Sequence, residues 1–152
     1  MGFFEQLLGN QVLISSMVGW TIAQLLKTII DFGLNKSFSP ERLVGSGGMP
    51  SSHSATVCAL TTSSGLCYGV GSFEFAVSFV FASVVMYDAI GVRQETGKQA
   101  KLLNMLIQHD FFKMNNLQFQ ETLKEFVGHT PIQVLAGAIL GIGISLIANL
   151  YY

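Results

Sequence analysis

The sequence predicts an all-α integral membrane protein, in which about four spanning helices form one bundle, with amphipathic helices on its positively charged side. Half of the 152 residues are hydrophobic and only 11% are charged, which is unusual for a soluble domain. The mean hydropathy of +0.50 also favours a membrane protein. Four apolar runs are close to the ~20 residues that a spanning helix needs: residues 12–34, 53–70, 73–92 and 132–151. We expect residues 1–152 to form a single domain.

The first run carries polar residues on one helical face. Gln24, Lys27 and Asp31 recur three and four residues apart, so a helix places them together. Polar residues in a spanning helix usually face partners or a site inside the bundle. For Lys27 two other interpretations remain open, namely pairing with Asp31 or extension of the amine to the lipid headgroups.

The second run is the most polar and must be shielded by other helices. It contains six serine and threonine residues, whose hydroxyls are expected to bond back to the helix or across to neighbours. The short turn at 68–72 predicts an antiparallel hairpin with the third run. In the fourth run, Gly137 and Gly141 let another helix approach closely, either within the bundle or in a homodimer.

Two further segments are predicted to form amphipathic helices, at 96–108 and 117–127. Their apolar residues recur at helical spacing, but both segments are too short or too polar to span. We expect them to lie on the membrane surface or to pack over the loop side of the bundle. A face that binds a partner within a membrane complex is the alternative.

The charges predict an orientation. Four crossings put residues 35–52 and 93–131 on one side, and all eight lysine and arginine residues lie in these segments or toward that end of the first run. Only Glu5 and Glu74 are charged on the other side. Positively charged loops of membrane proteins usually remain on the cytoplasmic side of the membrane. We therefore expect both segments to face the cytoplasm, stroma or matrix, and both termini to lie on the other side of the membrane.

A glycine- and serine-rich stretch at 45–54 predicts a helix start that binds an anion. Glycines allow a tight turn, Pro50 suits the beginning of a helix and serine caps free amide groups. His53 then lies in the first turn, where it can transfer a proton to or from an anion held by the helix amides. The alternative is an ordinary capped loop with a surface histidine.

A second helix start carries another histidine on the same predicted side. His129 precedes Thr130, a capping residue, and Pro131, which fits the first helical turn. At the end of the third run, Asp88 and Arg93 form either a boundary ion pair or the flank of a ligand site. The forked arginine side chain suits two oxygens of a phosphoryl group.

These residues together predict phosphoryl transfer through a phosphohistidine. One imidazole attacks phosphorus, cations and amides hold the oxygens, and the second imidazole protonates the leaving oxygen. The scheme needs no metal or other cofactor. The third histidine, His109, stands alone in the sequence and is not expected to belong to the site. We expect a membrane lipid or phosphorylated lipid as partner and no nucleic acid.

The same residues resemble the divergent membrane branch of the type-2 phosphatidic acid phosphatase and vanadium haloperoxidase superfamily. The resemblance covers nearly the whole chain, and its motifs are Lys27, Arg42, residues 48–53, Arg93 and residues 128–137. It implies that His53 is the general acid and His129 the nucleophile. It also implies a set of phosphate ligands, which are Lys27, Arg42, Ser51, the Ser52 amide and Arg93.

Three positions depart from the superfamily pattern. Arg42 follows Lys27 by fifteen residues instead of seven, and Arg93 lies far upstream of His129 instead of a few residues before it. Gln133 stands four residues after His129, where the superfamily usually has an acid. A neutral amide orients the imidazole but adds no negative charge to stabilise its cation.

Three functional hypotheses follow. The first is a membrane phosphatase acting on a lipid phosphate or diphosphate. The second is a weak or inactive relative that binds an anionic lipid or serves as a structural subunit of a membrane complex, which Gln133 and the segment 96–127 favour. The third, a soluble haloperoxidase-like enzyme, is disfavoured by the four apolar runs.

Overall fold

A computed structural model describes residues 2–36, 48–108, 123 and 128–151, and within them every regular element is an α-helix. The predicted all-α class is therefore confirmed. Four helices coincide with the four apolar runs, and two more flank them. The helices are α1 (Phe3–Leu8), α2 (Gln11–Asn35), α3 (Ser52–Tyr68), α4 (Phe73–Ile90), α5 (Val92–Gln108) and α6 (Pro131–Asn149).

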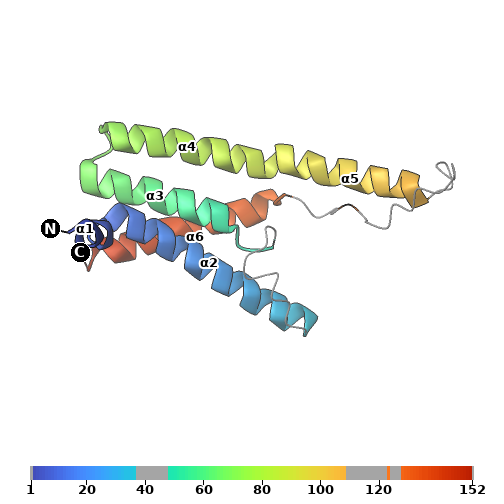
Figure 1. The fold of residues 1–152 in the computed structure, drawn as a ribbon, viewed down its shortest axis with the longest axis horizontal. Helices are drawn as coiled ribbons and strands as arrows, with labels where there is room; N and C mark the ends of the chain where they lie inside the picture. Colours follow the sequence, from blue (N-terminus) through green and yellow to red (C-terminus); the bar gives the residue numbers. More distant parts are fainter. Residues whose placement is uncertain (1, 37–47, 109–122, 124–127, 152) are drawn as a thin grey trace.

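Helix α3 lies at the centre of the bundle. It packs against α2, α4 and α6, whereas α2 and α4 make no contact with each other in the part of the chain that the structure describes. Figure 1 shows both termini at one end of the bundle, and the beginnings of α3 and α6 toward the other end. Residues from distant parts of the chain therefore meet where these two helices start.

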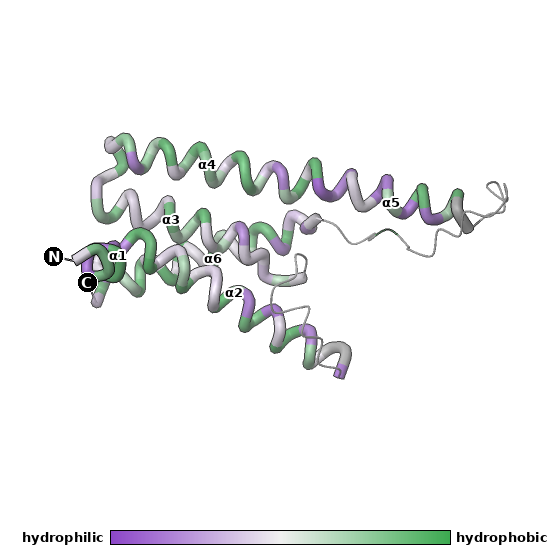
Figure 2. The backbone as a smooth tube through the Cα atoms, in the orientation of Figure 1, coloured by the Kyte–Doolittle hydropathy of each residue, from purple (hydrophilic) through white to green (hydrophobic). Residues whose placement is uncertain are grey.

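The bundle has the dimensions of a membrane protein. Three helical stretches among the described residues are long and apolar enough to cross a bilayer, at Gln11–Gly33, Phe73–Leu106 and Pro131–Asn149. The remaining predicted span forms α3, whose 17 residues extend about 26 Å at 1.5 Å per residue. Figure 2 shows that α3 is paler, hence more polar, than the strongly apolar α4 beside it. A polar helix is tolerated there because its neighbours shield it from lipid.

Hydroxyls of α3 bond back to their own helix and across to its neighbours, as the sequence predicts. Thr61 donates to the carbonyl of Val57 in its own helix and to that of Ser78 in α4, at 2.8 and 3.0 Å. Ser145 of α6 donates across to the carbonyl of Ala59 at 2.8 Å. These bonds tie α3 to two of its neighbours without exposing a polar group to lipid.

Helix α6 approaches α3 through its glycines. A Cβ atom at Gly137 would overlap the carbonyl oxygen of Ser51, and one at Gly141 would overlap that of Ala55. Both glycines are buried. Of the two predicted uses of this small-residue pair, the structure therefore supports packing inside the bundle.

Helix α5 differs from its prediction. It starts at Val92 rather than at 96 and continues the direction of α4 beyond the bundle, instead of lying across it (Figure 1). The reason is that Gly91 only briefly interrupts the hydrogen-bonded path, since the Glu95 amide already bonds to the Gly91 carbonyl at 3.0 Å. The second predicted amphipathic helix, at 117–127, lies outside the described residues except for Leu123.

Replacing Gly141 by alanine tests the α3–α6 contact. We expect Gly141→Ala to lower the free energy of unfolding by about 1–3 kcal/mol, the usual cost of overpacking, because the new methyl group meets the backbone of Ala55 and Ala59. The measurement is thermal or denaturant unfolding of the purified protein in detergent.

Gly143→Ala is the matched control on the same helix. Its new Cβ would have no neighbour within 4 Å, so we expect no loss of stability. Equal stability of the two variants would contradict a close α3–α6 approach at Gly141.

Candidate active site at the starts of α3 and α6

Helix α3 begins with a capped turn that is bonded to α6. Ser51 is the N-cap, and its hydroxyl oxygen accepts hydrogen bonds from the amide and the hydroxyl of Ser54, at 3.3 and 3.1 Å. The Ser51 amide donates to the carbonyl oxygen of Gln133 at 3.0 Å. Ser51 is fully buried. The beginnings of the two helices are thus held in register by a main-chain hydrogen bond.

Helix α6 begins with the predicted cap. Thr130 is the N-cap, Pro131 opens the first turn, and Thr130 and Gln133 form a reciprocal capping box. His129 lies just before this cap, and its amide donates to the carbonyl oxygen of Ala89 at the end of α4, at 3.0 Å. His129 is therefore fixed both to the start of α6 and to the end of α4.

The two predicted histidines face each other. Their ring centroids are 6.2 Å apart and the ring planes are inclined by 59°. His129 is the more deeply buried of the two, at 3% exposure, whereas His53 is half-buried. Two imidazoles at this separation can contact a single tetrahedral anion from two sides.

Gln133 determines which nitrogen of His129 carries the proton. Its side-chain oxygen accepts the Thr130 amide at 3.1 Å and lies 3.2 Å from His129 Nδ1. This contact orients the amide oxygen, and not the amide nitrogen, toward the ring. An oxygen at this position favours the tautomer with the proton on Nδ1, which leaves the lone pair on Nε2. This is the tautomer that a nucleophilic imidazole needs.

Lys27 is buried at the start of α3. It is 2% exposed, and its ammonium group donates to Gln24 Oε1 at 2.7 Å and to Ser52 Oγ at 3.4 Å. Gly48, at φ +86°, packs on its aliphatic stem, where a Cβ would lie 3.0 Å from Lys27 Cγ. Gln24 was not assigned to the site from the sequence, although its spacing of three residues from Lys27 was the available signal.

Arg93 reaches the site by a route that the sequence does not reveal. Its Nε donates to Asp88 Oδ2 at 2.6 Å, so the two predicted residues form an ion pair. Gly128 lies against the main chain of Arg93 and Gln94, where a Cβ would be 2.6 Å from the Gln94 nitrogen. Gly128 also has φ +105°, which favours glycine. An arginine distant in sequence is thus brought beside the residue that precedes His129.

These surroundings affect the protonation of His129. Burial lowers the pKa of its imidazole, the hydrogen bond with Gln133 raises it, and the positive charges of Lys27 and Arg93 lower it further, with a net lowering. The neutral ring is therefore favoured. Arg42, the remaining predicted phosphate ligand, lies outside the described residues.

The arrangement suits a tetrahedral oxyanion. It combines two imidazoles, two cations and the first-turn amides of Ser52 and His53 in α3, which have no acceptor within the helix. Among the described residues, no cluster of three or more histidine, cysteine or acidic side chains could hold a metal ion. The groups that are present can act as nucleophile, proton donor and anion ligands.

The fold and the site together define a helical membrane protein in which two histidines are paired at adjoining helix starts. The family model described as "Divergent PAP2 family" matches residues 8–144, and the chain belongs to this family. It is also similar to an uncharacterized membrane protein, YuiD, of Bacillus subtilis strain 168. The two are 38% identical over 156 residues, covering 97% of this chain and 99% of the relative. No solved structure matches the chain.

Titration of His129 tests the electrostatics of the site. We expect its pKa to lie below the usual value of about 6.5, as measured by NMR of isotopically labelled imidazoles in detergent. The unfolded chain then binds the proton more readily than the folded chain does. The contribution of this histidine to the free energy of unfolding should therefore fall as the pH drops below about 6.5. It should level off once the pH is below the pKa of His129 in the folded protein.

Gln133→Glu provides the comparison. A carboxylate beside Nδ1 favours the imidazolium, so this variant should raise the pKa of His129. An unchanged titration in Gln133→Glu would be inconsistent with the His129–Gln133 contact.

Proposed function

We propose that the chain is a metal-independent phosphatase that acts on a lipid phosphate or diphosphate through a phosphohistidine. The observation that carries the proposal is the His53–His129 pair at two adjoining helix starts, with centroids 6.2 Å apart. The protonated Nδ1 of His129 supports it, because Nε2 is then available to phosphorus. The family match is in agreement with a phosphatase-related function.

In the first step, His129 Nε2 attacks phosphorus and the bond from phosphorus to the lipid oxygen breaks. The protonated imidazole of His53 gives its proton to that oxygen, which leaves as the lipid alcohol or, from a diphosphate, as the lipid monophosphate. The phosphoryl group remains on His129. In the second step, His53 accepts a proton from water, the water oxygen attacks phosphorus, and the N–P bond breaks to release phosphate.

The remaining residues of the site bind or position the phosphate. Lys27 and Arg93 supply positive charge for the phosphoryl oxygens, and the Ser52 amide lies at the positive end of α3. Arg42 is a further expected ligand on the basis of the family resemblance. Ser51 remains a predicted ligand, although its hydroxyl oxygen already caps α3. Asp88 and Gln133 act as supports, by holding Arg93 and the His129 ring.

A second function is supported by one specific observation. Gln133 orients His129 but carries no charge to stabilise an imidazolium. A site of this kind can still bind a phosphorylated headgroup without hydrolysing it. The alternative is accordingly a protein that binds an anionic lipid, or a structural subunit of a membrane complex.

Phosphate release from lipid phosphates distinguishes the two functions. We expect the purified protein to release phosphate in the presence of a metal chelator, and His129→Ala to reduce release to background because no phosphohistidine can form. His53→Ala should lower the rate by about 10²–10⁴-fold, the usual contribution of a general acid. Mass spectrometry of protein quenched at alkaline pH should detect phosphate on His129.

Ile132→Ala is the control. This residue is 69% exposed on the first turn of α6, and its replacement should leave the rate unchanged. If wild type and His129→Ala release phosphate equally slowly, while both bind vanadate, the phosphatase proposal is wrong and the anionic-lipid alternative is favoured.

We also propose that the site faces the cytoplasm or its organellar equivalent, because the positive charges are concentrated at that end. Lys98→Cys, in a chain with Cys58 and Cys67 replaced by serine, tests this orientation. Lys98 is well exposed on α5, where it pairs with Glu95. We expect an impermeant thiol reagent to label it in inside-out vesicles and not in intact cells; the reverse pattern would invert the orientation.

A further inference from the structure

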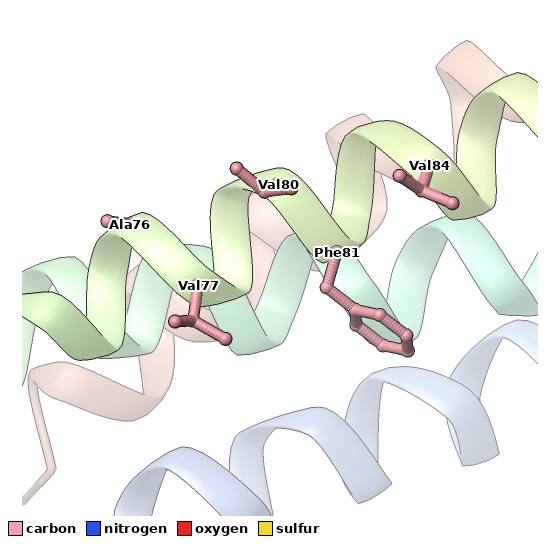
Figure 3. A pocket seen from close by; sticks show the side chains of 5 residues that line it. All are labelled: Ala76, Val77, Val80, Phe81 and Val84. Atoms are coloured by element: carbon pink, nitrogen blue, oxygen red, sulfur yellow. The ribbon is translucent and has the colours of Figure 1, made fainter.

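A groove runs along the outer face of α4, within the part of the helix that crosses the membrane. It has a volume of about 470 Å³ and is lined by Ala76, Val77, Val80, Phe81 and Val84 (Figure 3). All five side chains are apolar, and the four larger ones are between 50% and 61% exposed. Some apolar group from the surroundings must cover this surface.

The groove leads toward the paired histidines. Val77, Phe81 and Val84 lie at positions i, i+4 and i+7 of α4, and Asp88, at i+11, continues the same helical face. Asp88 holds Arg93 through the 2.6 Å ion pair. The apolar face therefore ends at a cation of the proposed phosphate site.

Helix α3 runs alongside in the opposite direction and brings His53 level with this end of the groove. The Thr61 hydroxyl contacts Ser78, and Cys58 Sγ lies 3.8 Å from Met86 Sδ, so positions toward the start of α3 match positions toward the end of α4. His53 itself is only half-buried. The Asp88 end of this helical face and the half-buried imidazole therefore lie at a similar level of the bundle.

The face of α4 that carries the groove is not covered by another helix among the described residues. In the described part of the chain α2 and α4 both pack on α3 but do not contact each other. Figure 3 shows Phe81 pointing away from the axis of α4 toward the α2 side. Along α3, Thr56 and Leu60 follow His53 at helical spacing, and both are half-buried.

We propose that this groove holds the hydrocarbon chain of a phosphorylated lipid whose phosphate occupies the paired-histidine site. The inference rests on the proposed function for the position of the phosphate, and adds where the chain lies. It follows from three observations: the lining is wholly apolar, it faces the hydrocarbon layer, and its helical face continues to Asp88, which pairs with Arg93.

A second copy of the protein fits the groove less well. Close packing of helices in a membrane uses small residues, and the buried small residues of α4, Ser78, Ala82 and Ala89, already lie on its inner face. The groove offers mainly valine and phenylalanine instead. Flexible hydrocarbon adapts to such an irregular surface, whereas a helix does not.

The groove also predicts a preference for long chains. Asp88 lies twelve positions after Ala76, which is a rise of about 18 Å along α4. A chain that reaches from the phosphate to Ala76 contacts the full groove, whereas a short chain leaves Val77 and Ala76 uncovered. Affinity for lipid phosphates should therefore rise with chain length through added van der Waals contacts, since a chain that is already in the bilayer gains no hydrophobic transfer free energy.

Photo-crosslinking in lipid nanodiscs tests the proposal. The probe is a phosphatidic acid with a diazirine halfway along one acyl chain, and the matched probe is the corresponding diacylglycerol without phosphate. We expect the phosphatidic acid to label residues 76–84 several-fold more than the diacylglycerol, as located by mass spectrometry of the cross-linked peptides. Equal labelling of this segment by both probes would overturn the proposal.

Val84→Trp fills the groove and should reduce labelling by the phosphatidic acid several-fold. Ile139→Trp is the matched control, because Ile139 is similarly exposed on α6, at 63% compared with 61% for Val84. Phe81→Ala removes one wall without adding bulk, and should also reduce the labelling. Thermal unfolding of each variant verifies that it is folded. If Val84→Trp and Phe81→Ala are both labelled as strongly as the wild type, the lipid chain does not lie in this groove.

A parallel phosphate-release assay separates this inference from the enzyme proposal. Selective labelling of the groove without phosphate release supports the chain-binding groove and rejects the phosphatase. Phosphate release with labelling elsewhere on the surface rejects the groove and leaves the phosphatase supported.

Discussion

The site depends on the close packing of α6 against α3. Gly137 and Gly141 bring the two backbones so near that no side chain fits between them, and the Ser51 amide then reaches the Gln133 carbonyl. This contact sets the relative height of the two helix starts, and with it the 6.2 Å spacing of the imidazoles. A shift of one helical turn, 5.4 Å in an ideal helix, would be comparable to that spacing and would separate the rings.

Much of this arrangement could be predicted from the sequence because it follows from local rules. The apolar runs located four helices, the caps at Ser51 and Thr130 located the two helix starts, and an even number of crossings put both starts on one side. The expected meeting of His53 and His129 is observed in the structure. These rules involve only spacing along the chain and the chemistry of helix ends.

The remaining features depend on contacts between distant segments, which spacing does not reveal. Arg93 lies far upstream of His129 in the sequence, whereas the superfamily pattern has an arginine a few residues before the histidine. In the structure, Gly128 lies directly against the main chain of Arg93 and Gln94. The direction of α5 was also missed, because the sequence predicts an apolar run that ends at 92 and a separate helix from 96, whereas α5 begins at Val92, directly after Gly91. The tautomer of His129 depends on the Thr130 amide, whose position required the capping box to be seen in three dimensions.

The continuity of α4 with α5 has a further consequence for the depth of the site. From Ser72, at the beginning of α4, to Arg93 the chain rises about 31 Å along a nearly straight path, which matches the thickness of a typical hydrocarbon layer, about 30 Å. If the Ser72 end lies at one interface, the guanidinium is at the level of the opposite headgroups. Membrane thickness therefore controls how far the paired histidines are from the lipid headgroups, and hydrophobic mismatch becomes a physical variable for this protein.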